Sequence, residues 1–157
     1  MDAKLIAEVE RWIAEDPDPT TQSELRRLLE LRDEATLRSC FSGFLEFGTA
    51  GLRGPLGPGP SRMNRAVVTK TAAGLAQYMK KNSLHSVVIG RDARYGSEDF
   101  TRDTAEIMQG AGFEVFVLPR PLPTPVLAFA VRDLNCVTQE AGAPEDYISS
   151  LINRPTR

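Results

Sequence analysis

One succession of segments constrains the fold of this chain most: an apolar run, a helical pattern and a second apolar run. The run Val87–Ile89 predicts a buried strand, the apolar spacing over 97–111 predicts a helix, and Phe113–Leu118 predicts a second buried strand. Two short apolar strands joined by a helix form a βαβ unit, in which the strands are parallel and the crossover is right-handed. The sequence therefore predicts an α/β fold.

A further helix is expected after the second strand, because Thr124 can act as its N-cap and Pro125 suits a first helical turn. Another strand should follow this helix, but after Val137 the chain becomes polar and loses its pattern. We therefore expect an incomplete sheet within a domain over residues 44–137, followed by an irregular or aberrant tail over residues 138–157.

The N-terminal part has the apolar spacing of short amphipathic helices. A first helix is expected to stop at Asp16–Pro19, since two prolines cannot continue a helix interior. The segment Thr21–Glu24 predicts a capping box that opens the next helix, and residues 37–41 continue the helical spacing. We expect a helical arm over residues 1–43 that buries its apolar stripe against something larger, such as the rest of the chain.

Charge and cysteine content exclude several classes of function. The 157 residues include 19 basic and 21 acidic ones, so no overall field attracts nucleic acid or an anionic membrane. Cys40 and Cys136 lie far apart and His85 is the only histidine, so no zinc or iron site of usual spacing can form. We expect no metal site, no nucleic-acid or membrane partner, and a reducing, cytoplasmic location.

The glycine-rich segment Phe47–Gly54 is the part of the sequence most informative about chemistry. Glycines let a backbone approach a ligand closely, and Arg53 offers a planar, permanently charged donor group that suits phosphate. Neither the dinucleotide-binding pattern nor the Walker pattern is present. Spacing alone is equally consistent with a phosphate site and with a glycine-rich turn whose arginine faces solvent.

The segment Phe47–Gly54 resembles the signature near the start of the α-D-phosphohexomutases, which move a phosphoryl group between positions on a sugar phosphate. Three later segments follow in that family's order and approximate spacing. With Asp16–Thr20 upstream, the resemblance is to the phosphoglucomutase and phosphopentomutase branch, and it extends from Trp12 to Leu134. The later segments are Gly59–Asn64, Val88–Ser97 and Leu122–Arg132.

The resemblance implies a first domain of α/β/α layers in a four-domain enzyme whose cleft collects one loop from each domain. Arg53 would hold the transferring phosphate beside a phosphorylated serine, and it is therefore the candidate catalytic residue. The candidate substrate-binding residues are Thr49, Gly51, Arg62 and Asn64. Arg91, Asp92 and Arg94 are interpreted as a salt-bridged structural turn.

The sequence also departs from the family. In the family, the helix that matches Thr124–Leu134 leads into a strand and then the loop Thr-Ala-Ser-His-Asn-Pro, whose serine carries the phosphate and whose neighbours help bind magnesium. After Leu134 no serine is followed by histidine, and the Asp-Gly-Asp metal loop and the Gly-Glu-x-Ser-Gly sugar loop are absent too. Magnesium and a sugar bisphosphate primer would serve the parent family, but neither is expected to bind this chain tightly.

The leading interpretation is a truncated or frame-shifted N-terminal fragment of an intramolecular phosphotransferase of carbohydrate metabolism. The parent would be a phosphoglucomutase, phosphomannomutase or phosphopentomutase, and the fragment would be inactive alone. The alternative is a noncatalytic module that binds a sugar phosphate weakly through Arg53 and Arg62, or that docks onto a mutase by its open sheet edge. Such an edge could also support self-association. A generic nucleotide-binding α/β domain is a third interpretation, which holds only if the motif match is accidental.

Overall fold

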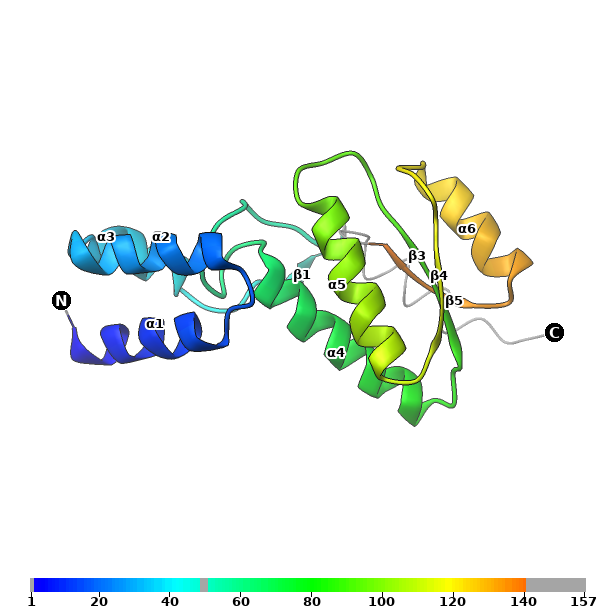
Figure 1. The fold of residues 1–157 in the computed structure, drawn as a ribbon, viewed down its shortest axis with the longest axis horizontal. Helices are drawn as coiled ribbons and strands as arrows, with labels where there is room; N and C mark the ends of the chain where they lie inside the picture. Colours follow the sequence, from blue (N-terminus) through cyan, green and yellow to red (C-terminus); the bar gives the residue numbers. More distant parts are fainter. Residues whose placement is uncertain (1, 49–50, 141–157) are drawn as a thin grey trace. The chain divides into compact units, whose positions relative to one another are not determined.

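The computed structural model describes residues 2–48 and 51–140, and these residues fall into two compact units (Figure 1). The first unit comprises Met1–Glu46 and Arg53–Val67. Of the described residues, the second unit comprises 47–48, 51–52 and 68–140. Among the described residues, no helix is both long and apolar enough to cross a membrane.

Three helices at the start of the chain pack on one another within the first unit. They are α1 (Ala3–Glu15), α2 (Pro19–Glu30) and α3 (Glu34–Cys40), and α1 contacts both of the others. The indole ring of Trp12 meets the ring of Phe41 edge-on, with 6.1 Å between the ring centroids. The helices of the predicted arm therefore bury their apolar stripes largely against each other. The buried side chains are Leu5, Val9, Trp12, Ile13, Leu25, Leu37 and Cys40.

The capping box predicted at Thr21–Glu24 is wrong, because α2 begins earlier. Asp18 is the N-cap, and its carboxylate accepts the N–H of Thr20 at 2.9 Å. Pro19 occupies the first helical turn, where a missing N–H costs nothing. The hydroxyl of Thr21 donates to the carboxylate of Asp16 at 2.7 Å and so ties the helix to the turn before it.

A parallel three-stranded sheet organises the second unit. Its central strand is β3 (Ser86–Gly90), with β4 (Glu114–Val117) on one side and β5 (Val137–Glu140) on the other. A separate antiparallel pair is formed by β1 (Phe47–Gly48) and β2 (Gly51–Leu52). The parallel pairing confirms the predicted α/β fold.

Helices cover both faces of this sheet, which gives the α/β/α layers. These helices are α4 (Arg65–Lys81), α5 (Ser97–Gly110) and α6 (Thr124–Asp133). The helix α6 begins one position earlier than predicted, because Pro123 rather than Thr124 is its N-cap.

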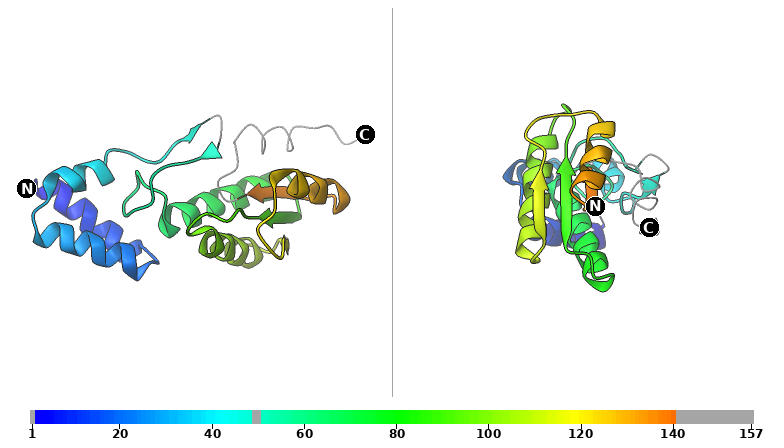
Figure 2. Two further views of the ribbon diagram at one scale, coloured as in Figure 1. Left: turned by 90° about the horizontal axis from the view of Figure 1, so that it is seen from above. Right: turned by 90° about the vertical axis from the view of Figure 1, so that its right-hand side faces the viewer.

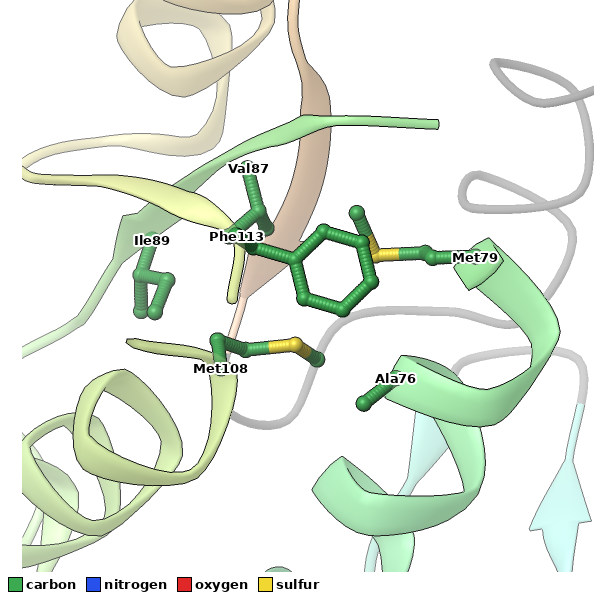
Figure 3. Packing of buried hydrophobic residues seen from close by; sticks show 6 residues of the cluster. All are labelled: Ala76, Met79, Val87, Ile89, Met108 and Phe113. Atoms are coloured by element: carbon green, nitrogen blue, oxygen red, sulfur yellow. The ribbon is translucent and has the colours of Figure 1, made fainter. Parts of the chain in front are cut away.

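Alternate residues of β3 point to opposite faces and so supply two apolar clusters. Figure 3 shows one of them, in which the ring of Phe113 lies beside the side chains of Met79 and Met108. This first cluster joins α4 and α5 to the sheet, and its buried members are Ala76, Met79, Val87, Ile89, Met108 and Phe113. The second cluster joins α6 to the other face and consists of Val88, Leu127 and Val131.

Two of the strand predictions need correction. The strand β4 was expected to be buried, but Glu114 is exposed and Val117 is 47% exposed, because β4 is the outer strand of the described sheet. The pattern was expected to be lost after Val137, yet β5 continues to Glu140 in register with β3. A parallel ladder uses backbone groups, which polar residues supply as well as apolar ones. The rest of the predicted tail, residues 141–157, lies outside the described residues.

We expect Met108→Ala to lower the free energy of unfolding by about 2–5 kcal/mol, because it removes buried atoms and leaves a cavity between α5 and the sheet. Urea denaturation of the parent and the variant measures this change. Gln109→Ala, which alters an exposed residue on the same helix, is the matched control and should change stability by less than about 0.5 kcal/mol. A cost for Met108→Ala as small as that of the control would contradict the packing described.

Candidate functional site

The segment from Arg53 to Asn64 is a loop that folds back on α3 within the first unit. The N–H of Ser61 donates to the carbonyl of Cys40 at 3.1 Å, and the hydroxyl of Ser61 donates to the carbonyl of Gly43 at 2.8 Å. Gly59 has a φ of +88°, and a Cβ there would lie 2.6 Å from the carbonyl oxygen of Cys40. Only glycine permits this close approach of loop and helix, a requirement that the sequence analysis missed.

Asn64 holds this loop together. Its side chain is almost fully buried, and its amide nitrogen donates to the carbonyl oxygens of Gly57 at 2.9 Å and Gly59 at 2.8 Å. Its amide oxygen accepts the N–H of Val67 at 2.9 Å, which is the geometry of an N-cap for α4. These contacts support a structural role for Asn64, and its predicted contact with a substrate stays a prediction.

The two candidate arginines of this region differ in their contacts. Arg62 is half-buried and donates to the hydroxyl of Ser39 at 3.0 Å. Arg53 directly follows β2 and is exposed. Among the described residues, no carboxylate pairs with Arg53, and no hydrogen bond joins it to Arg62 or Asn64. The guanidinium of Arg53 thus has no partner among the described residues, whereas that of Arg62 already uses one of its N–H groups.

Gly51, another predicted binding residue of the signature, lies in the antiparallel pair of β1 and β2. The backbone of Gly51 in β2 pairs with Gly48 in β1. Thr49, the other predicted binding residue of the signature, lies outside the described residues. The structure therefore leaves both substrate-binding assignments as predictions.

The predicted turn lies at the carboxyl end of β3, and Asp92 is its centre. One carboxylate oxygen of Asp92 accepts the N–H of Arg94 at 3.0 Å and the hydroxyl of Ser97 at 2.8 Å. The other oxygen lies 2.6 Å from the guanidinium of Arg94. Arg91 lies farther from its own partner, with 3.9 Å between its guanidinium and a carboxylate oxygen of Glu98.

These contacts set the charge state of Asp92. Partial burial raises the pKa of its carboxyl, but the hydrogen bonds from the backbone of Arg94, from Ser97 and from the Arg94 guanidinium together outweigh burial. The net effect holds the pKa of Asp92 below its ordinary value. The carboxylate and the guanidinium of Arg94 therefore neutralise each other inside the turn.

The carboxyl edge of the sheet brings several loops of the second unit together. The register pairs Gly90 with Glu140, so that the end of β5 lies beside the start of the Asp92 turn. The N–H of Leu122, in the loop before α6, donates to the carbonyl of Arg91 at 3.1 Å. In parallel α/β sheets, ligand sites gather at this edge.

Two hollows of the described surface are lined by none of the predicted site residues. One hollow of about 310 Å³ in the first unit is lined by Asp2, Glu8, Arg38 and Phe41, among others. Another, of about 230 Å³, is lined by residues that precede β3 and β4, such as His85 and Phe113. The second hollow is therefore at the amino end of the strands, opposite the Asp92 turn.

The donor groups of the described residues do not fit a magnesium site. Over residues 2–48 and 51–140, no group of three or more His, Cys, Asp or Glu side chains is placed to hold a metal ion. The carboxylate of Asp92, at the edge where ligands gather, is already engaged by Arg94 and Ser97. No step of a reaction is therefore assigned to a metal held by these residues.

Among known protein families, residues 45–139 match the one described as phosphoglucomutase/phosphomannomutase, alpha/beta/alpha domain I. A probable phosphoribomutase of Schizosaccharomyces pombe is 36% identical over 139 residues, covering 86% of this chain and 24% of the relative. The phosphopentomutase of Mus musculus is 35% identical over 145 residues, covering 86% and 23%. A probable phosphomannomutase of Haemophilus influenzae is 49% identical over 90 residues, covering 54% and 19%.

The chain thus spans about a quarter or less of the length of these curated relatives. No solved structure matches it.

We expect Asn64→Ala to destabilise the first unit by about 1–3 kcal/mol, because it removes a helix cap and the side-chain hydrogen bonds to the carbonyls of Gly57 and Gly59. Asn64→Asp should also destabilise, since it keeps the acceptor for Val67 but sets a carboxylate against the carbonyls of Gly57 and Gly59. Urea denaturation measures both variants. Asn82→Ala, an exposed asparagine beyond the end of α4, is the matched control. Equal stability of all three variants would contradict the role assigned to Asn64.

Because of Asp92, the free energy of unfolding of the second unit should decrease as the pH falls into the acidic range. A carboxyl whose pKa is lowered by folding stabilises the fold above its unfolded pKa of about 3.9, and this contribution is lost as the pH falls through the folded pKa. Asp92→Asn should therefore be less stable than the parent at neutral pH, and the difference should vanish below the folded pKa. Ser97→Ala, which removes one hydrogen bond to the carboxylate, should move this loss to higher pH. Urea denaturation as a function of pH tests both, and parallel profiles for all three proteins would contradict the interpretation.

Proposed function

This chain belongs to the phosphoglucomutase/phosphomannomutase family, and from that premise we propose that it serves as the first α/β/α domain of a phosphomutase. The observation that carries the proposal is the family match over residues 45–139. That span contains the β1–β2 pair, Arg53, the Asp92 turn and nearly all of the parallel sheet.

The proposed task of Arg53 is to hold a phosphoryl group. Its guanidinium is exposed and pairs with no carboxylate among the described residues, so it is free to bind two phosphate oxygens at once. Phosphoryl transfer depends mostly on positioning and on charge stabilisation, and the permanent charge of a guanidinium supplies the second. Arg94 is less suited to this task, because Asp92 already neutralises its charge.

The proposed ligand class is a sugar phosphate. The names of the relatives cover phosphoribomutase, phosphopentomutase and phosphomannomutase, so they support the class rather than one sugar. Arg62 and Asn64 would act mainly by shaping the loop next to the ligand, since their polar groups already bond to Ser39 and to loop carbonyls.

We further propose that transfer requires groups that other domains supply. The 157 residues contain neither the serine loop nor the metal and sugar loops that the family resemblance implies. Magnesium would be held by such groups rather than by the described residues, and a sugar bisphosphate would prime the complete enzyme. The proposed location is the cytoplasm, because Cys40 and Cys136 are free thiols, the state that a reducing compartment maintains.

We expect the chain to bind glucose 1-phosphate or ribose 1-phosphate weakly, and Arg53→Ala to weaken binding by about 10-fold or more. Calorimetry at millimolar ligand measures the affinity. Arg132→Ala removes the same charge from the exposed surface of α6 and is the matched control, with an unchanged affinity. Equal affinity of Arg53→Ala and the parent would contradict the role of Arg53.

An activity assay separates a catalytic domain from one that needs partners. With magnesium and a sugar bisphosphate primer present, we expect no interconversion of glucose 1-phosphate and glucose 6-phosphate by this chain. Turnover that disappears in Arg53→Ala would contradict the claim that other domains are needed. If calorimetry detects no heat with glucose 1-phosphate and none with ribose 1-phosphate, the proposed binding of a sugar phosphate is wrong. The interpretation of the chain as a noncatalytic binding module is then wrong as well.

A further inference from the structure

The outer edge of β4 presents backbone groups that β3 does not use. The N–H of Glu114 donates to the carbonyl of His85 at 3.0 Å, and the N–H of Leu118 donates to the carbonyl of Ile89 at 2.9 Å. In a parallel strand, alternate residues bond to the same neighbour. Val115 and Val117 therefore direct their N–H and C=O groups away from β3. Over residues 2–48 and 51–140, no strand pairs with this edge (Figure 2).

The side chains along the same edge are apolar and incompletely covered. Val117 is 47% exposed, although it is part of a strand. Phe116 packs against the cluster of Val88 and Leu127 but stays half-exposed, since α6 packs on β3 and β5. Charge and proline normally protect sheet edges, and here they stand only at the two ends, as Glu114 at the start of β4 and Pro119 after Leu118. Val115–Leu118 between them contain neither.

We propose that this edge pairs with the same edge of a second copy of the chain, antiparallel and about a two-fold axis at Phe116. Val115 then lies opposite the partner's Val117, and each such pair exchanges both N–H···O=C bonds, because all of these groups point outward. Phe116 lies opposite the partner's Phe116 in a position without hydrogen bonds, where side chains come closest. In this arrangement the outer edge of β4 is paired in both copies. No further copy can add to that edge, so the assembly ends as a dimer.

Charge favours this arrangement over a parallel one. Glu114 precedes the apolar edge and Arg120 follows it. Antiparallel pairing sets Glu114 opposite the partner's Leu118, toward the partner's Arg120, whereas parallel pairing would set like charges side by side. The strand is short, and its pairing buries less than the roughly 1,200 Å² of a stable interface, so the dimer is weak, with a Kd of about 0.1–1 mM.

Sedimentation of the full chain over a range of concentrations tests the proposal. The mass should rise from 17.3 kDa toward twice that value as the concentration approaches about 1 mM. Val117→Pro removes only an outward N–H, which an edge strand tolerates, and should weaken association by at least about 10-fold. Val117→Lys should do the same, whereas Val126→Lys, at a valine 39% exposed on α6, is the matched control and should leave association unchanged. A monomer at every concentration, or a dimer that Val117→Pro leaves intact, overturns the proposal.

Disulfide capture tests the register. In a Cys136→Ser background, Phe116→Cys should form a covalent dimer on oxidation, because the paired Cα atoms are within the reach of a disulfide. Val117→Cys should not, since its Cα atom lies about 8 Å or more from the partner's Val117, beyond that reach. Equal cross-linking of the two variants overturns the two-fold axis at Phe116. The Val117 variants keep the proposal falsifiable if Phe116→Cys fails to fold, and none of these outcomes depends on the role proposed for Arg53.

Discussion

The second unit depends on the pairing of β3 with a parallel strand on each side. This pairing satisfies the backbone of β3 along both edges and leaves Val87, Val88 and Ile89 with no exposed surface. A strand buried on both faces requires helices on both, which α4 and α5 supply on one face and α6 on the other. The same pairing sets the carboxyl ends of β3 and β5 side by side, and so brings the Asp92 turn to the edge where parallel sheets bind ligands.

Whether an arginine of this chain can bind phosphate depends on the groups that its guanidinium already contacts. Arg53 and Arg94 are both exposed, and composition gives no reason to prefer either as a phosphate ligand. Arg94 is paired with Asp92, whose carboxylate also accepts a hydrogen bond from Ser97, so its charge serves the shape of the turn. Arg53 lacks such a partner among the described residues. The charge proposed to bind phosphate is therefore that of Arg53, whereas the charge of Arg94 stays within the Asp92 turn.

The sequence predicted those features that depend on local pattern. The run Val87–Ile89 is apolar because it is buried on both faces, and the predicted buried strand is confirmed as β3. Apart from Glu114 the residues of β4 are apolar too. A run of residues cannot reveal whether a neighbouring strand lies on both sides, and β4 is the outer strand of the described sheet. The strand β5 could not be found by hydropathy, because its polar residues pair through their backbone. The carbonyl contacts of Asn64 depend on a loop fold that no periodicity describes.

The claim that residues 45–139 work as the first domain of a phosphomutase is tested most directly by exchange into a relative. The phosphopentomutase of Mus musculus would receive these residues in place of its own matching segment and keep the rest of its chain. We predict that the chimera retains phosphopentomutase activity within about 100-fold of the parent enzyme, and that Arg53→Ala in the chimera lowers kcat/KM by a further factor of about 10 or more. A chimera that unfolds as cooperatively as the parent but has no activity would contradict the claim.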